Sequence, residues 1–407
     1  MGEEIKTKLE KGADTPTSQP TGDHKGQDEI EDALARFKVI RSSYLQRVFN
    51  ALPLVILVGS IAFILFLRHI QGTTWGLVFI AAGGASASII SVLVTKNLFN
   101  RFPGILLILW RRKLLKLRSV EKSAPRQSAT KVCAQFQRFV ALSEQRLNGK
   151  TSIAFGFIVL LVAFWLGGQF RILSASEWAT TLRSDPLVTS IGLLMFLFYY
   201  AFAFIAGLFV WRIAVIAWRI RQLGIEFDFN LQVEHPDGCG GLRRIGDLCL
   251  MLAYILSPFL LLGGGWLTLT NLTGRTYWNI SASTAQAFLI SMTALSLICF
   301  FQPLTAIHAA MNRSKLELQK DLDLISQQIH QLGVELMANA ERLSAEEGAK
   351  LEKKIDFLRR VYDRNSKIPA WPIRYDHLWR LATTQIAPVI GLGTSGIGLV
   401  KGLQDLF

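Results

Sequence analysis

"ALPLVILVGSIAFILFL", residues Ala51 to Leu67, contains no charged side chain. A helix of about 20 apolar residues crosses the hydrocarbon core of a bilayer, which is roughly 30 Å thick. Such a run predicts a transmembrane helix. It also fits the composition of the whole chain, in which 51% of the residues are hydrophobic and only 18% are charged.

Five further runs of this kind follow along the sequence. Together with the first, they cover residues 51–67, 74–95, 151–170, 187–218, 248–270 and 285–307. None has Asp, Glu, Lys or Arg near its centre. The fourth is too long for one perpendicular span, so it tilts or continues beyond the membrane. We therefore expect an all-α polytopic membrane protein with six firm transmembrane helices, a domain that we place at residues 36–311.

The basic residues are distributed unevenly between the loops. Residues 101–150 carry twelve Lys or Arg residues and two acids, Glu121 and Glu144. By contrast, the loops at 68–73, 171–186 and 271–284 carry few charges. The positive-inside rule then places the N-terminus in the cytoplasm. The net charge of +14 is interpreted as basic loops facing anionic lipid, with the bilayer rather than nucleic acid as partner.

Three segments are expected on the cytoplasmic side. Residues 1–35 are polar and mixed in charge, which predicts a disordered tail. "FPGILLILWRRKLLKL", from Phe102, favours a helix lying on the inner leaflet, with a continuation of the second span as the alternative. Residues 312–368 contain two heptad seams divided by the capping box "SAEE" at Ser344. This pattern favours a helical hairpin over one long helix that continues the sixth span.

The C-terminal segment, residues 369–407, is expected to be membrane-embedded or interfacial. "KIPAWPI" breaks the helix before a last apolar run, Leu378 to Val400. This run forms a seventh span, a re-entrant segment or a helix on the inner leaflet. Glycine-rich and polar backbone is costly in lipid unless it meets protein or water. The residues that we expect to line a pore or cavity are Gln385, Gly391, Gly393, Thr394, Gly396 and Gly398.

"HPDGCGGL", His235 to Leu242, lies between the fourth and fifth spans. Alternating apolar and polar residues before it predict a half-buried strand over 227–233. The residues of the loop itself predict a tight structural turn: His235, Pro236, Asp237, Gly238, Gly240 and Gly241. The alternative is a metal site formed by His235, Asp237 and Cys239, although these ligands are of mixed hardness and match no known metal-binding spacing.

No catalytic motif is apparent, so we expect neither an enzyme nor a cofactor. The four cysteines are scattered and predict no disulfide framework. Two functions are considered. The first is a homo-oligomeric, channel-like membrane protein with the C-terminal run near the pore. The second is a non-conducting anchor or signalling component that recruits a cytoplasmic protein partner.

"HPDGCGGL" together with "IPAWPI" resembles uncharacterised polytopic bacterial inner-membrane proteins, which carry an HPDxxGGL-like loop and an IPxWPF-like ending. Ile373 stands where that ending has Phe. The resemblance covers two short stretches and implies a bacterial inner membrane, without an activity. The order of spans is also similar to that of insect chemoreceptor channels. That similarity is one of topology alone and implies a pore lined by the last helix.

Overall fold

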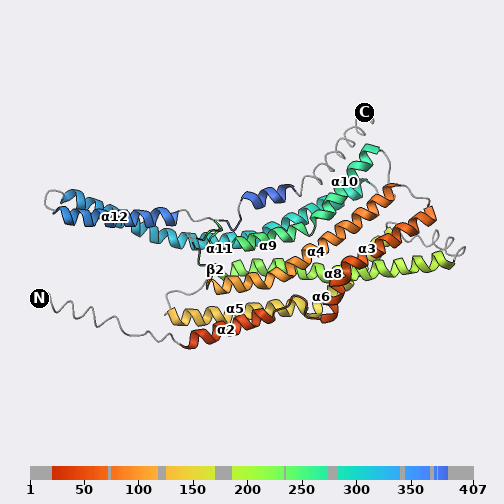
Figure 1. The fold of residues 1–407 in the computed structure, drawn as a ribbon, viewed down its shortest axis with the longest axis horizontal. Coiled ribbons are helices and arrows are strands. Elements are labelled where there is room, and N and C mark those ends of the chain that lie inside the picture. Colours follow the sequence, from red (N-terminus) through yellow and green to blue (C-terminus); the bar gives the residue numbers. More distant parts are fainter. Residues whose placement is uncertain are drawn as a thin grey trace.

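A computed structural model of the chain describes residues 21–71, 75–117, 125–169, 186–232, 235–273, 282–339, 344–366, 371–373 and 375–383. The helices are α2 (Thr21–Arg36), α3 (Ser43–Gln71), α4 (Trp75–Arg111), α5 (Pro125–Asn148), α6 (Lys150–Gln169), α8 (Pro186–Glu226), α9 (Arg243–Tyr254), α10 (Ser257–Thr273), α11 (Ala282–Ala338) and α12 (Ala345–Ser366). Two short strands, β1 (Leu115–Leu117) and β2 (Phe227–Phe229), pair in antiparallel fashion. Residues 375–383 are also helical. The helices run roughly side by side along the long axis of the molecule (Figure 1).

Within the described residues, six helices are long and apolar enough to cross a membrane, as the sequence predicts. Large apolar side chains point outward along one part of the bundle, which we call the apolar belt. It includes Leu54, Val58 and Leu65 of α3, Ile153, Phe157 and Leu161 of α6, Leu194 and Leu197 of α8, and Ile290 and Ile298 of α11. A belt of this kind is the surface that faces lipid. The chain is therefore an all-α polytopic membrane protein.

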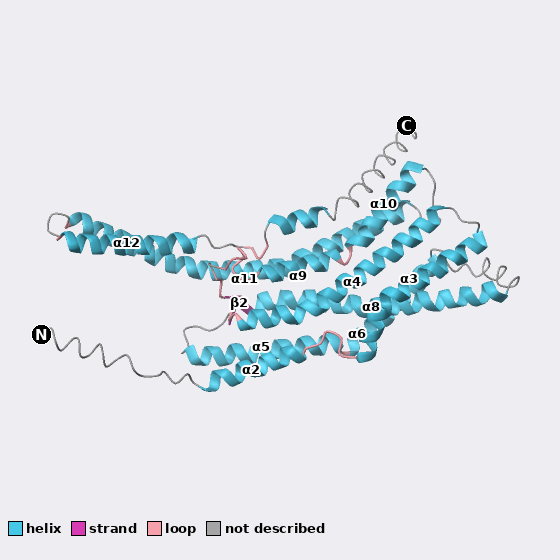
Figure 2. Ribbon diagram, viewed as in Figure 1, coloured by secondary structure: helices cyan, strands magenta, loops and turns pink. Residues whose placement is uncertain are grey.

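Several helices continue past the belt and pack into a second region, which we call the extension. It consists of α2, α5, α9, α12, the two strands and the ends of α4, α8 and α11 (Figure 2). Its interior is as apolar as the core of a soluble protein, with Phe102, Phe136, Phe139 and Phe227 fully buried. Burial of such side chains contributes about 1.5–3 kcal/mol each, so the extension has a stabilising core of its own.

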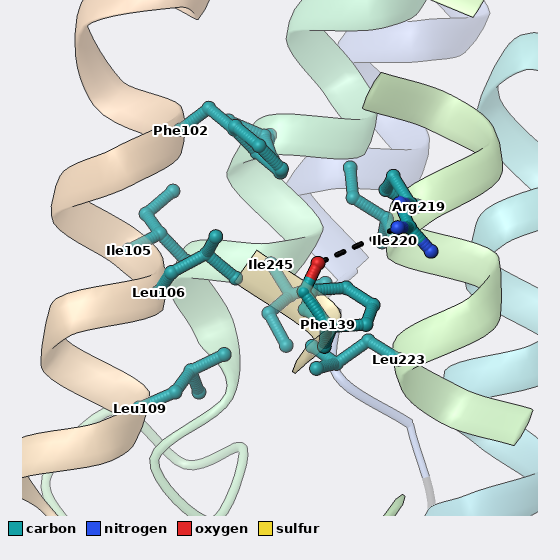
Figure 3. A pocket seen from close by; sticks show the side chains of 10 residues that line it. Phe102, Ile105, Leu106, Leu109, Phe139, Arg219, Ile220, Leu223 and Ile245 are labelled. Carbon is teal, nitrogen blue, oxygen red and sulfur yellow. Dashed lines mark hydrogen bonds between the residues drawn. The ribbon is translucent and has the colours of Figure 1, made fainter. Parts of the chain in front are cut away.

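Charged groups are also buried among the described residues, among them Arg212, Arg219 and Asp228. Arg219 of α8 is buried beside a small cavity lined by side chains from α4, α5, α8 and α9 (Figure 3). Its guanidinium donates to the carbonyl oxygen of Phe139 at 3.4 Å and lies over the ring of the same residue, 4.9 Å from the centroid. These contacts offset part of the cost of burying the charge.

The segment from Phe102 is not an interfacial helix, and this expectation is wrong. α4 continues through Pro103 to Arg111 without interruption. Phe102, Leu106 and Leu109 are buried against α5, α8 and α9 instead of lipid. The apolar face that suggested membrane attachment is therefore a protein core.

The N-terminal region also differs from the expected disordered tail over 1–35. α2 begins at Thr21, and its residues Ile30 and Leu34 are buried in the core. α2 contacts α5 and α4, and Glu31 forms an ion pair with Arg111 at 2.8 Å. A polar helix with a narrow apolar stripe resembles a disordered segment by composition, but here Ile30 and Leu34 are buried in the core.

α11 runs without a break through position 312, where the sequence suggests a domain boundary. Its last turns pack against α12, so the long continuous helix and the hairpin are both present. α12 begins with the expected capping box. The Glu347 backbone N–H donates to Ser344 Oγ at 3.3 Å, and the Ser344 N–H donates to Glu347 Oε2 at 3.1 Å.

The strand expected over 227–233 is shorter than its alternation indicates. β2 ends at Phe229 because its partner β1 has only three residues. Asp228 is buried as well as its phenylalanine neighbours, since Arg313 of α11 donates to its carboxylate at 2.7 Å. Strict alternation implies that Asp228 faces solvent. Its carboxylate is instead buried in an ion pair with Arg313 of α11. Residues 233–234 lie outside the described part of the chain.

Candidate functional site around helix α9

The loop "HPDGCGGL" is organised by the carboxylate of Asp237. Oδ1 accepts hydrogen bonds from the backbone N–H groups of Cys239 at 2.8 Å and Gly241 at 3.1 Å, and Oδ2 accepts one from Arg243 at 3.3 Å. Arg243 is the first residue of α9, so Asp237 also caps that helix. Burial raises the pKa of Asp237, but these N–H groups and His235 outweigh it and hold the pKa below its ordinary value.

His235 connects the loop to the end of α4. Its Nε2 meets the guanidinium of Arg112, and its Nδ1 lies 3.0 Å from Asp237 Oδ1. Because arginine has no acceptor, Nε2 accepts from Arg112, while Nδ1 also lies 3.3 Å from the backbone N–H of Asp237, which donates to it. The imidazole therefore acts as a bridge between Arg112 and the carboxylate that caps α9.

The loop does not bring His235, Asp237 and Cys239 together as metal ligands. Both oxygens of Asp237 are already used by backbone N–H groups, and both nitrogens of His235 have partners. Within the part of the chain that the structure describes, no group of three His, Cys, Asp or Glu residues could hold a metal ion.

The three glycines of the loop adopt backbone conformations that other residues avoid. Gly238, Gly240 and Gly241 have φ angles of 64°, 64° and 93°. A side chain at Gly240 or Gly241 would also meet close neighbours, because an added Cβ would lie 3.2 Å from Leu231 and from Leu114 respectively. At Gly238 the space is open.

α9 forms the surface on which residues 371–383 rest. A Cβ at Gly246 would lie 2.5 Å from the carbonyl oxygen of Pro372, so the two backbones approach as closely as glycine allows. The imidazole Nε2 of His377 lies 2.8 Å from Asp247 Oδ1. From α11, His308 stacks on Trp371 with ring centroids 3.8 Å apart. Residues 371–373, the described part of the "IPAWPI" motif, thus dock against α9 and α11. We call α9, its preceding loop and residues 371–383 the α9 junction.

The segment 248–270, expected as one span, is two helices. α9 ends at Tyr254 and α10 begins at Ser257, because Pro258 has no N–H to continue the helical ladder. Hydroxyl groups of neighbouring helices donate to carbonyls at the break. Ser91 of α4 donates to Ile255 O at 2.7 Å, and Ser296 of α11 to Ala253 O at 3.5 Å.

Sequence reasoning identified the loop and the "IPAWPI" motif but missed their connection. His377, Asp247 and His308 belong to separate segments, and no local spacing indicates that they meet. Pro258 in the fifth apolar run indicates from the sequence that helical hydrogen bonding can break there, and the break lies directly before it. The residues expected to line a pore, Gln385 to Gly398, lie outside the described residues.

Comparisons of the chain with protein-family models, with curated proteins and with solved structures found no match.

Proposed function

We propose that the protein is an oligomeric, channel-like protein of a bacterial inner membrane, with its N-terminus and extension in the cytoplasm. The C-terminal run that follows Thr383 lies near the conduction path. The observation that carries this proposal is the α9 junction. It holds residues 371–383, which lead directly into that run, against the same helix that leads into the membrane helix α10.

This arrangement supports coupling between the two regions. α9 is capped by a loop that is bonded to the end of α4, and it is followed by the break before α10. Because the helical ladder is interrupted between Tyr254 and Ser257, α9 is able to move as a unit relative to α10. Movement of α9 would then carry the C-terminal run with it through Gly246 and His377.

Water accessibility of the C-terminal run tests the proposal. Single cysteines replacing Gln385, Thr394 and Gly398 are treated, in liposomes, with a membrane-impermeant thiol reagent, and current is recorded across planar bilayers. We expect modification of at least two positions and a change in current upon modification. Cysteine at Leu161, a lipid-facing position that is 67% exposed in the isolated chain, is the control and should stay unmodified. If none of the three cysteines reacted with the reagent and the planar bilayers carried no current, a channel would be contradicted.

Orientation is tested separately. A cysteine at residue 275 should react with impermeant reagent from outside intact cells, because we place the loop that contains it outside the membrane. Chemical cross-linking of the protein in its native membrane should give a discrete ladder that ends at one stoichiometry. Labelling only from the cytoplasmic face would reverse the proposed topology.

A second candidate function is a non-conducting anchor that recruits a cytoplasmic partner. The observation that favours it is the outer surface of the α11–α12 hairpin, where Met337 is 83% exposed and Phe357 is 62% exposed. Exposed large apolar side chains outside a membrane are typical of interaction surfaces. Recording no current, together with loss of biological activity upon Met337→Ser and Phe357→Ser substitution, would favour this function over a channel.

A further inference from the structure

The segment between α2 and α3 lies beside the junction of α5 and α6, at the boundary between the apolar belt and the extension (Figure 2). Asn148, the last residue of α5, holds the two together. Its Oδ1 accepts from the Arg41 backbone N–H at 3.1 Å, and its Nδ2 donates to the Lys38 carbonyl at 3.2 Å. Two chain segments more than a hundred residues apart are thereby fixed in one place.

Basic residues outnumber acidic residues at this place. Residues 37–47 and 145–157 contain no Asp or Glu, and the neighbouring acid is Glu144, directly before the second range. Their basic residues are all exposed: Lys38, Arg41, Arg47, Arg146 and Lys150. α3 begins at Ser43 and α6 at Lys150, so two helix N-termini add their partial positive charge. We call this group of residues the basic joint.

The position of the basic joint along the helices matches the depth of lipid headgroups. On α3, Arg47 precedes the lipid-facing Leu54 by two helical turns on the same side of the helix. On α6, Lys150 precedes Ile153 and Phe157 in the same way. Charged side chains one or two turns beyond an apolar belt lie where phosphate groups of the bilayer are found.

Aromatic residues mark the same level. The Arg146 guanidinium lies over the Trp218 ring, 4.1 Å from the centroid. Trp211 Nε1 donates to the Arg146 carbonyl at 3.2 Å. Both tryptophans belong to α8, and tryptophan is enriched at the membrane–water boundary. These two tryptophans therefore indicate the same membrane–water boundary as the basic residues do.

We propose that the basic joint binds the phosphate headgroup of an anionic phospholipid, from the leaflet that faces the extension. The charge complementarity is local, since five exposed cations lie on the two segments that Asn148 joins and on the first turns of α3 and α6, ahead of the lipid-facing Leu54 and Phe157. The bound headgroup links the start of α3 to the start of α6. This proposal requires membrane insertion only and holds whether or not the protein conducts ions.

The test uses the full-length protein in nanodiscs of phosphatidylcholine that contain a defined fraction of phosphatidylglycerol. Retained phosphatidylglycerol is counted by native mass spectrometry, and its affinity is measured by titration with a fluorescent analogue. In the triple variant Lys38→Gln, Arg41→Gln and Lys150→Gln, we expect an affinity lower by about tenfold or more, because each cation near a membrane surface contributes on the order of 1 kcal/mol. High salt should weaken binding to the unaltered protein.

A matched variant removes the same charge elsewhere. Lys353→Gln, Lys354→Gln and Arg360→Gln change exposed residues of α12, away from the belt, and should leave lipid affinity unchanged. Equal losses in both variants, or no loss in the first, would overturn the proposal. So would inorganic phosphate binding to the detergent-solubilised protein that depends on the same three residues and shows no lipid preference. Equal melting temperatures of the three proteins confirm that folding is unaffected.

Discussion

His377 Nε2 lies 2.8 Å from Asp247 Oδ1, and this contact joins the C-terminal helical residues to α9 across 130 positions of sequence. His377 is buried, with 1% of its surface exposed, and its Nδ1 lies 3.4 Å from Asp376. A buried imidazole held between two carboxylates favours one orientation of the segment that carries it.

Replacing His377 with Ala should destabilise the protein and release residues 375–383. Loss of one partner of a buried hydrogen bond costs about 1–3 kcal/mol. We expect a lower thermal midpoint in detergent and faster hydrogen–deuterium exchange in these residues. His330→Ala removes an exposed histidine of α11 and serves as control. An unchanged exchange rate in the His377 variant would show that the contact does not hold the segment.

A side chain at Gly246 should separate the same two elements by a different route. Gly246→Val places a Cβ 2.5 Å from the Pro372 carbonyl, which is backbone and cannot move aside alone. We expect faster exchange in 371–383 and a loss of about 2 kcal/mol or more of stability. Gly333→Ala, in the open part of α11, meets nothing within 4 Å and should be neutral or slightly stabilising. Similar effects in both variants would contradict close docking at Gly246.

Asp237→Ala should destabilise the α9 junction by about 2 kcal/mol, because three backbone N–H groups lose a charged acceptor. The effect also predicts a pH dependence. The folded-state pKa of Asp237 is lowered, so its stabilising contribution is complete above the unfolded value of about 3.9 and is lost as pH falls through the folded value. Thermal midpoints measured from pH 6 down to about pH 3 should therefore fall more steeply for the unaltered protein than for Asp237→Asn. Parallel curves would contradict this role.

The stability cost of substituting a loop glycine should depend on the space around it as well as on its φ angle. Gly241→Val combines a positive φ with a Cβ contact of 3.2 Å to Leu114, and we expect it to cost more than Cys239→Ser. Gly238→Asn should be nearly neutral, since the space there is open and asparagine tolerates positive φ. Denaturation midpoints of the purified variants would rank the three substitutions by how much each destabilises the protein. If Cys239→Ser were the most damaging, the thiol rather than the backbone would be the important feature.

The apolar helices could be predicted from the sequence because a membrane span is a local property of composition. The same local reasoning failed for residues 102–109 of α4, since an apolar helix face looks alike whether it meets lipid or protein. It also failed for Ile30 and Leu34 of α2, where a short apolar stripe becomes informative only when α5 is known to lie beside it.

The α9 junction could be predicted only in part. The loop glycines indicated positive φ through their type, and their φ angles are positive. The contacts of His377 and Gly246 depend on how residues 371–383 return to α9. That return is set by the combined packing of α9 and α11, which no single stretch of the sequence encodes.

The break between α9 and α10 is stabilised by a side chain of α4. The Ile255 carbonyl has lost its helical partner and accepts instead from Ser91 Oγ at 2.7 Å, in a buried setting. Ser91→Ala should therefore leave a buried carbonyl unsatisfied, at a cost of about 1–3 kcal/mol. Ser86→Ala is the matched control on the same helix, because Ser86 is exposed and donates only to Ala82 O within α4. We expect a lower thermal midpoint and faster exchange around 253–256 for Ser91→Ala alone. If the two variants behaved alike, water or a backbone shift would be satisfying the break, and α4 would not be holding the start of α10 in place.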